Sequence, residues 1–184
     1  MGEFTLTKSV SDVQEAPLLR EDWYVMRIVE EPTMESNGAL KEYMKGRGLS
    51  EPKTASQEDV TRFLAMAMED DKAAEKIGLN LVLKLRVQSD DPASNGRLFR
   101  KYLPWPNEKD KTRYTNGGQS YEDFKLGQIK SVVAAFNGGV EPAGSSIVLE
   151  PGMEAQFYVT ISLDQQSQKM RNELDMNQAP KAVL

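Results

Sequence analysis

The sequence predicts an α+β fold that is mainly β, with a helical insertion after the first strand. Apolar and polar residues alternate in several short segments, which is the pattern of half-buried strands. Two other segments carry apolar residues at helical spacing. Four Asn-Gly pairs separate these segments, and Asn-Gly favours the positive φ angles of tight turns. At 184 residues, we expect a single domain with its own apolar core.

Five segments have the pattern of strands. The first is DWYVMRIVEE, where Tyr24, Met26 and Ile28 share one face. GLNLVLKLRVQ and RLFRKYLPW follow as a hairpin, and GMEAQFYVTISLDQQSQKMRNELDM forms a second hairpin that turns near residues 165–168 and returns towards Met176. The alternation places six residues in the core: Leu81, Leu83, Leu85, Phe157, Val159 and Ile161.

Helical spacing appears in two places. In the insertion, at about 38–77, Ser56 and Asp59 have the spacing of an N-terminal cap. The second helix is expected from Ser120 to Phe136, ended by Asn137-Gly138. An N-terminal arm at 1–17 and a flexible C-terminal tail at about 177–184 complete the organisation.

The order is therefore strand, helical insertion, hairpin, helix, hairpin. Five strands with a helix between strands 3 and 4 is the order of an OB-fold, a small and partly open barrel that binds oligonucleotides or oligosaccharides. A sandwich built from the same elements is the alternative.

Composition excludes several classes of site. The chain has no Cys and no His, so it has no thiol nucleophile, imidazole base or Cys/His zinc site. A calcium loop beginning at Asp91 is rejected because Ala93 and Tyr102 occupy ligand positions. No P-loop or dinucleotide motif is present, and we expect neither an enzyme nor a cofactor or metal. Without a signal-peptide pattern or a long apolar run, a cytoplasmic location is expected and no membrane contact.

One segment differs in charge from the rest of the chain. RLFRKYLPWPNEKDKTRY, residues 97–114, has six Lys or Arg and two acidic residues, whereas the chain has a net charge of -5. Single-strand binders combine cations that follow the phosphates with aromatic rings on which bases stack. The candidate binding residues are Lys84, Arg86, Arg97, Phe99, Arg100, Lys101, Tyr102, Trp105, Lys109, Lys111, Arg113, Tyr114, Tyr158 and Arg171.

The same pattern has an ordinary structural interpretation. A strand rich in Lys and Arg is often an exposed face, and aromatic residues in strands more often pack in the core. Residues 107–114 would then form a solvated loop. Register decides between these interpretations, because a shift of one residue exchanges core and surface.

Several stretches, in order, resemble the OB-fold single-stranded-DNA-binding proteins of phage replication and recombination modules, a family often known only as a domain of unknown function. They are LLREDWYVMRIVE, GLNLVLKLRV with NGRLFRKYLPWPNEKD, FKLGQIKSVVAAFN and LEPGMEAQFYVTISLDQQSQKMRNELD, about two thirds of the chain. The closing hairpin with Asn172 and Glu173 is the most recognisable part. The long insertion and the lack of an acidic C-terminal tail depart from the family.

The resemblance implies sequence-independent binding of single-stranded DNA in phage replication or recombination, in the host cytoplasm. Replication or recombination proteins are candidate partners, as is a second copy of the chain. The alternative is a non-catalytic virion or assembly protein. An enzyme that holds magnesium at Glu173 and Asp175, or at Asp90 and Asp91, is the least favoured hypothesis.

Overall fold

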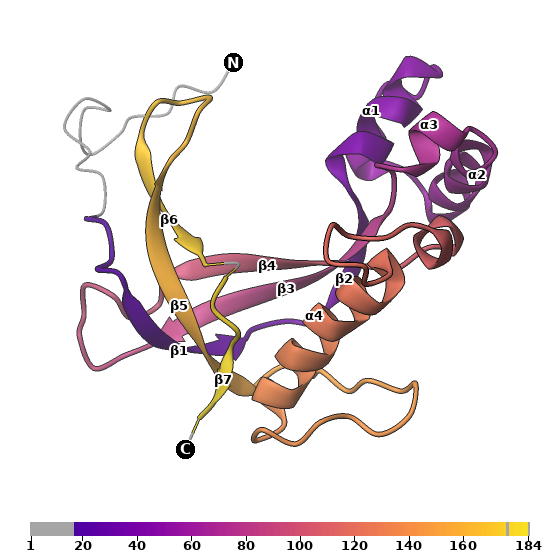
Figure 1. Cartoon of the computed structure of the whole chain (residues 1–184). Helices are drawn as coiled ribbons and strands as arrows, with labels where there is room; N and C mark the ends of the chain where they lie inside the picture. The colour runs from indigo at the N-terminus through magenta and orange to yellow at the C-terminus, as the bar shows by residue number, and fades with distance from the viewer. Residues whose placement is uncertain (1–16, 176, 184) are drawn as a thin grey trace, which may run out of the picture.

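The structure is a computed structural model that describes residues 17–175 and 177–183 (Figure 1). In these residues the chain forms an α+β fold around one antiparallel sheet of seven strands. The strands are β1 (Asp22–Ile28), β2 (Thr33–Ser36), β3 (Leu79–Gln88), β4 (Leu98–Pro104), β5 (Glu154–Leu163), β6 (Met170–Leu174) and β7 (Lys181–Ala182). The helices are α1 (Gly38–Gly46), α2 (Gln57–Met68), α3 (Asp71–Ala74) and α4 (Tyr121–Phe136), with short 3-10 helices η2 (Pro52–Thr54) and η3 (Glu108–Thr112).

The sheet has the two hairpins that the sequence predicts. β1 pairs with β3 on one side and with β5 on the other. β4 pairs with β3, and β6 pairs with β5. Among the described residues no hydrogen-bonded pairing joins β4 to β6, so the sheet is not closed.

The first predicted strand, DWYVMRIVEE, is shorter in the structure, and a strand that the sequence did not predict follows it after a break. β1 ends at Ile28, and β2 resumes at Thr33 along the same neighbour, β3. Pro32 lies in the break, where its missing N–H cannot contribute a ladder hydrogen bond. β2 and β3 pair as a hairpin, and the helical insertion lies between them in the chain.

The main core lies between the sheet and α4. Five of the six predicted core residues are buried there, and α4 adds Ile129, Val132, Val133 and Phe136. The sixth, Ile161, is only half-buried. β1 begins at Asp22, opposite Val159, so Ile161 has a strand neighbour on one side only.

Both predicted helix starts are confirmed. The Ser56 and Ser120 hydroxyls accept from the backbone N–H groups of Asp59 and Asp123, at 3.1 and 3.0 Å. At the end of α4, Asn137 is the C-cap residue and Gly138 has a φ of +66°, a left-handed conformation that glycine adopts without strain. The second helix therefore spans the predicted residues.

The insertion, residues 38–77, has a small core of its own. Leu40, Met44, Phe63, Ala67 and Ile77 form a buried cluster separate from the main core. In Figure 1, α1, α2 and α3 stand at one end of β3 and β4, and the β5–β6 hairpin rises at the other end. β3 and β4 therefore run from the β5–β6 hairpin to the helices of the insertion.

The C-terminal segment returns to the sheet. Where the sequence predicts a flexible tail from about 177, Lys181 and Ala182 form β7 and pair with Gln156 and Ala155. Of the other terminal predictions, Met176 and residues 1–16 of the N-terminal arm lie outside the described residues.

Candidate nucleic-acid interface

The register of β3 and β4 determines which side chains share the outer face. Lys84 lies opposite Arg100, and Arg86 lies opposite Leu98. Leu83 and Leu85, which alternate with these cations, are fully buried. The predicted register is therefore confirmed, and the cations lie on the side of β3 away from the leucines.

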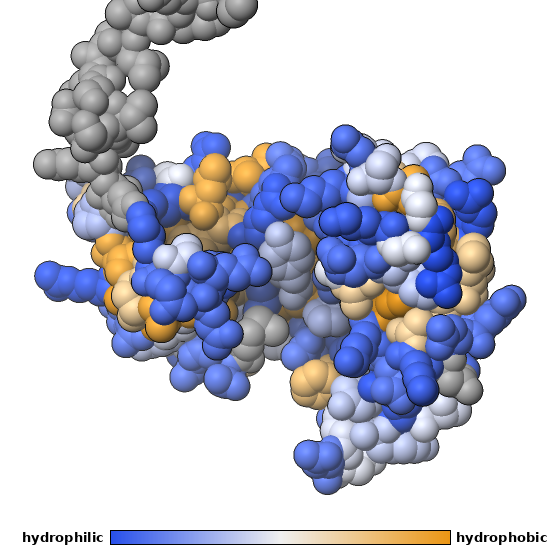
Figure 2. All heavy atoms as spheres, turned by 90° about the horizontal axis from the view of Figure 1, so that it is seen from above, coloured by the Kyte–Doolittle hydropathy of each residue, from blue (hydrophilic) through white to orange (hydrophobic). Residues whose placement is uncertain are grey.

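Three hollows meet on this outer face. One, of about 640 Å³, lies between the insertion, β2, β3 and β4, and we call it the insertion pocket. Another, of about 770 Å³, lies between β4 and β6 and is called the β4–β6 groove. A third, of about 450 Å³, lies beside Lys84 and Arg86. Arg100 lines all three hollows. Figure 2 looks down between the insertion and the β5–β6 hairpin and shows apolar side chains exposed among hydrophilic ones.

Carboxylates neutralise part of this face. Lys84 forms an ion pair with Glu30, whereas neither Arg86 nor Arg100 is ion-paired with any carboxylate of the described residues. A hydrogen bond to Tyr102 is the main reason that the pKa of the Arg100 guanidinium is raised. Arg100 is exposed, so a charged guanidinium is available to a ligand on this face.

Lys101, predicted to belong to this face, lies on the other one. It is paired with Leu83 and follows Arg100 directly, so the alternation of the strand points it towards the interior. Its residue is 7% exposed, and burial lowers the pKa of its ammonium while Asp175 opposes that shift. Lys101 therefore does not share the exposed face with Lys84, Arg86 and Arg100, although it lines the β4–β6 groove.

The four aromatic residues of segment 97–114 divide into two pairs. Phe99 and Trp105 are partly buried against the main core, and the Trp105 backbone N–H donates to the Leu79 carbonyl at 2.8 Å. Phe99 also lines the β4–β6 groove and the third hollow, but it is less exposed than Tyr102. Tyr102 is 44% exposed and lines the insertion pocket and the β4–β6 groove. Tyr114 is exposed but lines none of the three hollows. Tyr102 is thus the aromatic side chain best placed for a ligand.

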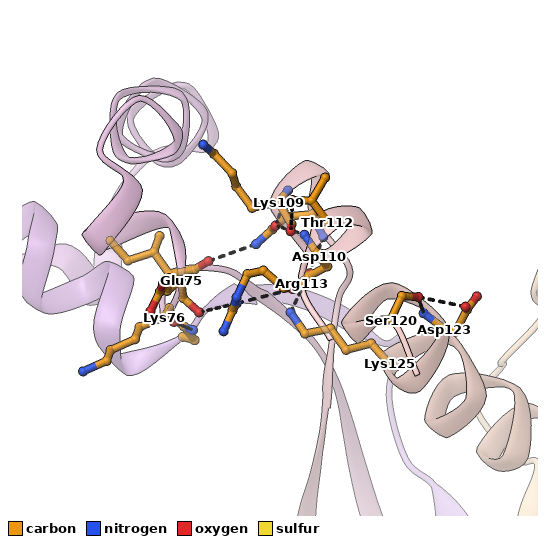
Figure 3. Close-up of polar contacts among 12 residues, drawn as sticks. Glu75, Lys76, Lys109, Asp110, Thr112, Arg113, Ser120, Asp123 and Lys125 are labelled. Atoms are coloured by element: carbon orange, nitrogen blue, oxygen red, sulfur yellow. Dashed lines mark hydrogen bonds and ion pairs between the residues drawn. The ribbon is translucent and has the colours of Figure 1, made fainter. Parts of the chain in front are cut away.

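Residues 107–113 form a structural connection in place of a solvated loop. Asp110 is fully buried, and the Lys125 ammonium lies 2.7 Å from its carboxylate (Figure 3). Arg113 donates to the Glu75 carbonyl at 2.8 Å, which ties η3 to the insertion. Lys111 pairs with Glu108 at 2.8 Å, and Lys109 is a neighbour in the same turn. Lys111 and Arg113 thus have protein partners, and none of Lys109, Lys111 and Arg113 lines the three hollows.

The remaining candidates lie at the edges of the face. The Arg97 guanidinium donates to the carbonyls of Pro17 and Ala93. Arg171 lines the β4–β6 groove but is paired with Asp164, at 2.6 Å, and with Glu173. Both cations are therefore partly satisfied by the protein itself.

Tyr158 belongs to a different cluster. Its ring meets Trp23 edge to face, with centroids 5.6 Å apart, and the Lys181 ammonium lies 3.7 Å from the Trp23 ring centroid. This cluster joins β1, β5 and β7 and does not line the three hollows. The structure therefore does not bring Tyr158 to the β3–β4 face.

Asn172, in the most recognisable part of the sequence, holds the N-terminal segment. Its side-chain amide accepts from the Leu19 N–H at 2.7 Å and donates to the Leu19 carbonyl at 3.0 Å. This pair of bonds replaces the ladder bonds that a neighbouring strand would make. The role of Asn172 is therefore to attach residue 19 to β6.

Sequence reasoning missed two cations of the site, Lys41 and Lys53. Both line the insertion pocket together with Lys84 and Arg100. Nothing in the local pattern of the insertion places them there, because their position depends on how the insertion folds back over β2. Leu98 and Met170, exposed apolar residues of the β4–β6 groove, were not singled out either.

No protein-family model matches the sequence, and no curated protein matches it. The resemblance to phage single-stranded-DNA-binding proteins therefore stays a prediction. In the described part of the chain, no helix has both the length and the apolar character that a membrane crossing requires. The described residues also hold no cluster of three or more acidic residues suited to a metal ion.

Proposed function

We propose that this protein binds single-stranded DNA without sequence preference and without catalysis, across the outer face of β3 and β4. One observation carries the proposal: Arg86 and Arg100, which have no ion pair among the described residues, lie on one face with the exposed ring of Tyr102. Cations that follow the phosphates and a ring on which a base stacks are the two components of single-strand binding. The hollows beside them give a strand room to enter.

We further propose that the sheet is the partly open barrel of an OB-fold. The strand pairing supports this, because β1 and β2 together take the place of the first OB strand and pair with β3, while β1 also pairs with β5. α4 follows β4 and precedes β5, which is the place of the helix in that fold. The second and third strands of an OB-fold then correspond to β3 and β4, whose face binds oligonucleotides in that fold.

The resemblance to phage proteins adds the biological setting to the proposal. The chain would protect single-stranded DNA during replication or recombination of a phage genome in the host cytoplasm. An acidic protein needs only one positive face for this, since its remaining surface discourages DNA from binding elsewhere.

A labelled oligothymidylate tests the proposal. Fluorescence anisotropy at several salt concentrations, from about 50 to about 200 mM, gives the slope of log affinity against log salt. Each phosphate neutralised contributes about 0.7 to that slope for single strands, so Arg86 and Arg100 together account for about 1.4. Absence of salt-sensitive binding would contradict the proposal.

One observation favours a second candidate, an assembly or interaction protein. Leu98 is 66% exposed, and Leu18 and Met170 are exposed beside it in the β4–β6 groove. Exposed apolar groups gathered in one place are typical of protein interfaces as well as of base contacts. If the oligonucleotide does not bind, this candidate becomes the leading one.

A further inference from the structure

The insertion pocket is the most polar of the hollows on the β3–β4 face. Its charged lining consists of four cations and one carboxylate: Lys41, Lys53, Lys84, Arg100 and Glu35. Lys41 comes from α1 and Lys53 from η2, so the insertion and the sheet contribute two cations each. Neither Lys41 nor Lys53 is ion-paired with any carboxylate of the described residues, whereas Lys84 has Glu30. The pocket therefore has positive charge that the described side chains do not neutralise.

Hydrogen bonds from the sheet side fix the position of the insertion. Three consecutive carbonyls after α3 accept from the side chains of three residues outside the insertion. Arg113 donates to Glu75 at 2.8 Å, Asn37 to Lys76 at 2.8 Å, and Asn107 to Ile77 at 3.2 Å. Figure 3 shows Arg113 reaching towards this segment from η3, beside the buried Asp110. Lys41 and Lys53 thus belong to an insertion whose end is fixed by hydrogen bonds to residues outside it.

The β4–β6 groove, on the other side of Tyr102, has a different chemistry. Leu18, Leu98, Met170 and Leu174 line it. Of its cations besides Arg100, Arg97 donates to backbone carbonyls, Lys101 is buried, and Arg171 is paired with Asp164 and Glu173. A nucleic acid strand has a charged backbone and apolar base faces, so the two hollows suit its two parts.

We infer that the insertion pocket is a phosphate-binding subsite, in which Lys41 and Lys53 contact the backbone of a strand whose bases lie on Tyr102 and towards the β4–β6 groove. This inference rests on the proposed function and deepens it. It gives the insertion a role, which no pattern in the sequence indicates. The ligand is the phosphodiester group, so the contact is independent of base sequence.

The test compares two charge-matched double variants of the full chain. Lys41→Gln/Lys53→Gln removes two cations of the pocket, and Gln keeps part of the side-chain stem. The control Lys72→Gln/Lys76→Gln removes two exposed cations of the same insertion that do not line the pocket. The probe is a labelled oligothymidylate, titrated over the same salt range as the wild type. Lys53→Gln alone is the fallback variant, because Lys53 is exposed whereas Lys41 is half-buried.

The pocket variant should lower the slope of log affinity against log salt by about 1.4, or about 0.7 for Lys53→Gln alone, while the control keeps the wild-type slope. If wild type binds with a salt-dependent affinity and the pocket variant keeps its slope, this inference is wrong and the proposed function stands. Equal losses in both double variants would also overturn it, since long-range charge would then explain the effect. If wild type does not bind, the proposed function fails, and the subsite with it.

Discussion

The Lys125 ammonium of α4 lies 2.7 Å from the Asp110 carboxylate of η3, and Asp110 has no exposed surface. Asp110 also accepts from the Asn107 backbone N–H at 2.8 Å, which closes a capping box at the start of η3. A buried pair of this kind contributes most when both partners are present, because removing one leaves the other charge without its partner in a poorly solvated place. The contact joins the connection after β4 to the helix that covers the core.

Asp110→Asn should therefore lower the free energy of unfolding by about 3 kcal/mol, the lower end of the range for breaking a buried pair, since Lys125 keeps some exposure. Adding Lys125→Met should recover part of the loss, with a coupling energy of about 0.5–3 kcal/mol in a double-mutant cycle. Urea unfolding of the wild type, the two single variants and the double variant measures the coupling energy. Additive losses would show that the pair does not act as a unit.

Tyr102 and Trp105 should respond differently to substitution by Ala. Tyr102→Ala should weaken binding of an oligonucleotide by about 1–3 kcal/mol and leave the salt slope unchanged, because stacking releases no counterions. Trp105→Ala should chiefly destabilise the fold, by up to about 3–5 kcal/mol, because its ring packs against the main core. Thermal unfolding and anisotropy titrations of both variants separate the two effects. A stable Trp105→Ala protein with impaired binding would reverse these assignments.

The insertion should be removable at one defined point. Ser36 and Leu79 are cross-strand partners, and the Asn37 N–H donates to the Gly78 carbonyl at 3.0 Å. Deleting residues 38–77 joins Asn37 directly to Gly78, which creates the Asn-Gly pair favoured in two-residue hairpin turns. The shortened chain should fold cooperatively and lose three side-chain hydrogen bonds to the insertion, each of about 0.5–1.5 kcal/mol.

Circular dichroism and urea unfolding of the deletion variant test this expectation. A variant that cannot fold would mean that the insertion is part of the main core, despite its separate cluster. The control is a longer deletion, which removes β2 as well as residues 38–77. Because β2 pairs with β3 along residues 79–82, this deletion also takes away a strand neighbour of β3.

Acid should weaken the attachment of Glu21 to β5. The Glu21 carboxylate accepts from the Thr160 hydroxyl at 2.7 Å and from the Ile161 N–H at 3.0 Å, and these bonds lower its pKa from the ordinary 4.5. The folded state then binds fewer protons than the unfolded state, so this stabilisation is present above about pH 4.5 and is lost as pH falls through the lower, folded-state pKa.

Glu21→Gln should therefore be less stable than wild type at neutral pH, and the difference should shrink below pH 4.5. Thermal unfolding between pH 3 and pH 7 measures it, because this range extends to both sides of the ordinary value of 4.5. Glu31→Gln, at an exposed position outside these bonds, is the control. A difference that does not change with pH would exclude a role for the charged form of Glu21.

The strand and helix patterns could be predicted because they are local. Alternation at residues 79–88 placed Leu83 and Leu85 inside and Lys84 and Arg86 outside, and Ser120 with Asp123 placed the start of α4. The same alternation also puts Lys101 inside, but the concentration of charge in segment 97–114 drew it into the predicted patch. The charge of Lys101 suggested an exposed position, whereas its place in the alternation of the strand indicates a buried one.

The missed parts depend on contacts that are distant in sequence. Lys41 and Lys53 lie at the β3–β4 face through the fold of the insertion, whose end is held by hydrogen bonds from Arg113, Asn37 and Asn107. Arg113 looked like a ligand for DNA for the same reason, since its acceptor, the Glu75 carbonyl, is 38 residues away. Neither relationship has a signature in a single segment.

The salt dependence of binding to a single-stranded oligonucleotide tests the central claim most directly. Wild type is compared with Arg86→Gln/Arg100→Gln, and with Arg62→Gln/Lys130→Gln as a charge-matched control away from the three hollows. We expect that wild-type affinity falls as salt rises, that the first variant lowers the slope by about 1.4, and that the control keeps it. Wild-type protein that does not bind the oligonucleotide, or an Arg86→Gln/Arg100→Gln variant that binds as wild type does, would contradict this claim.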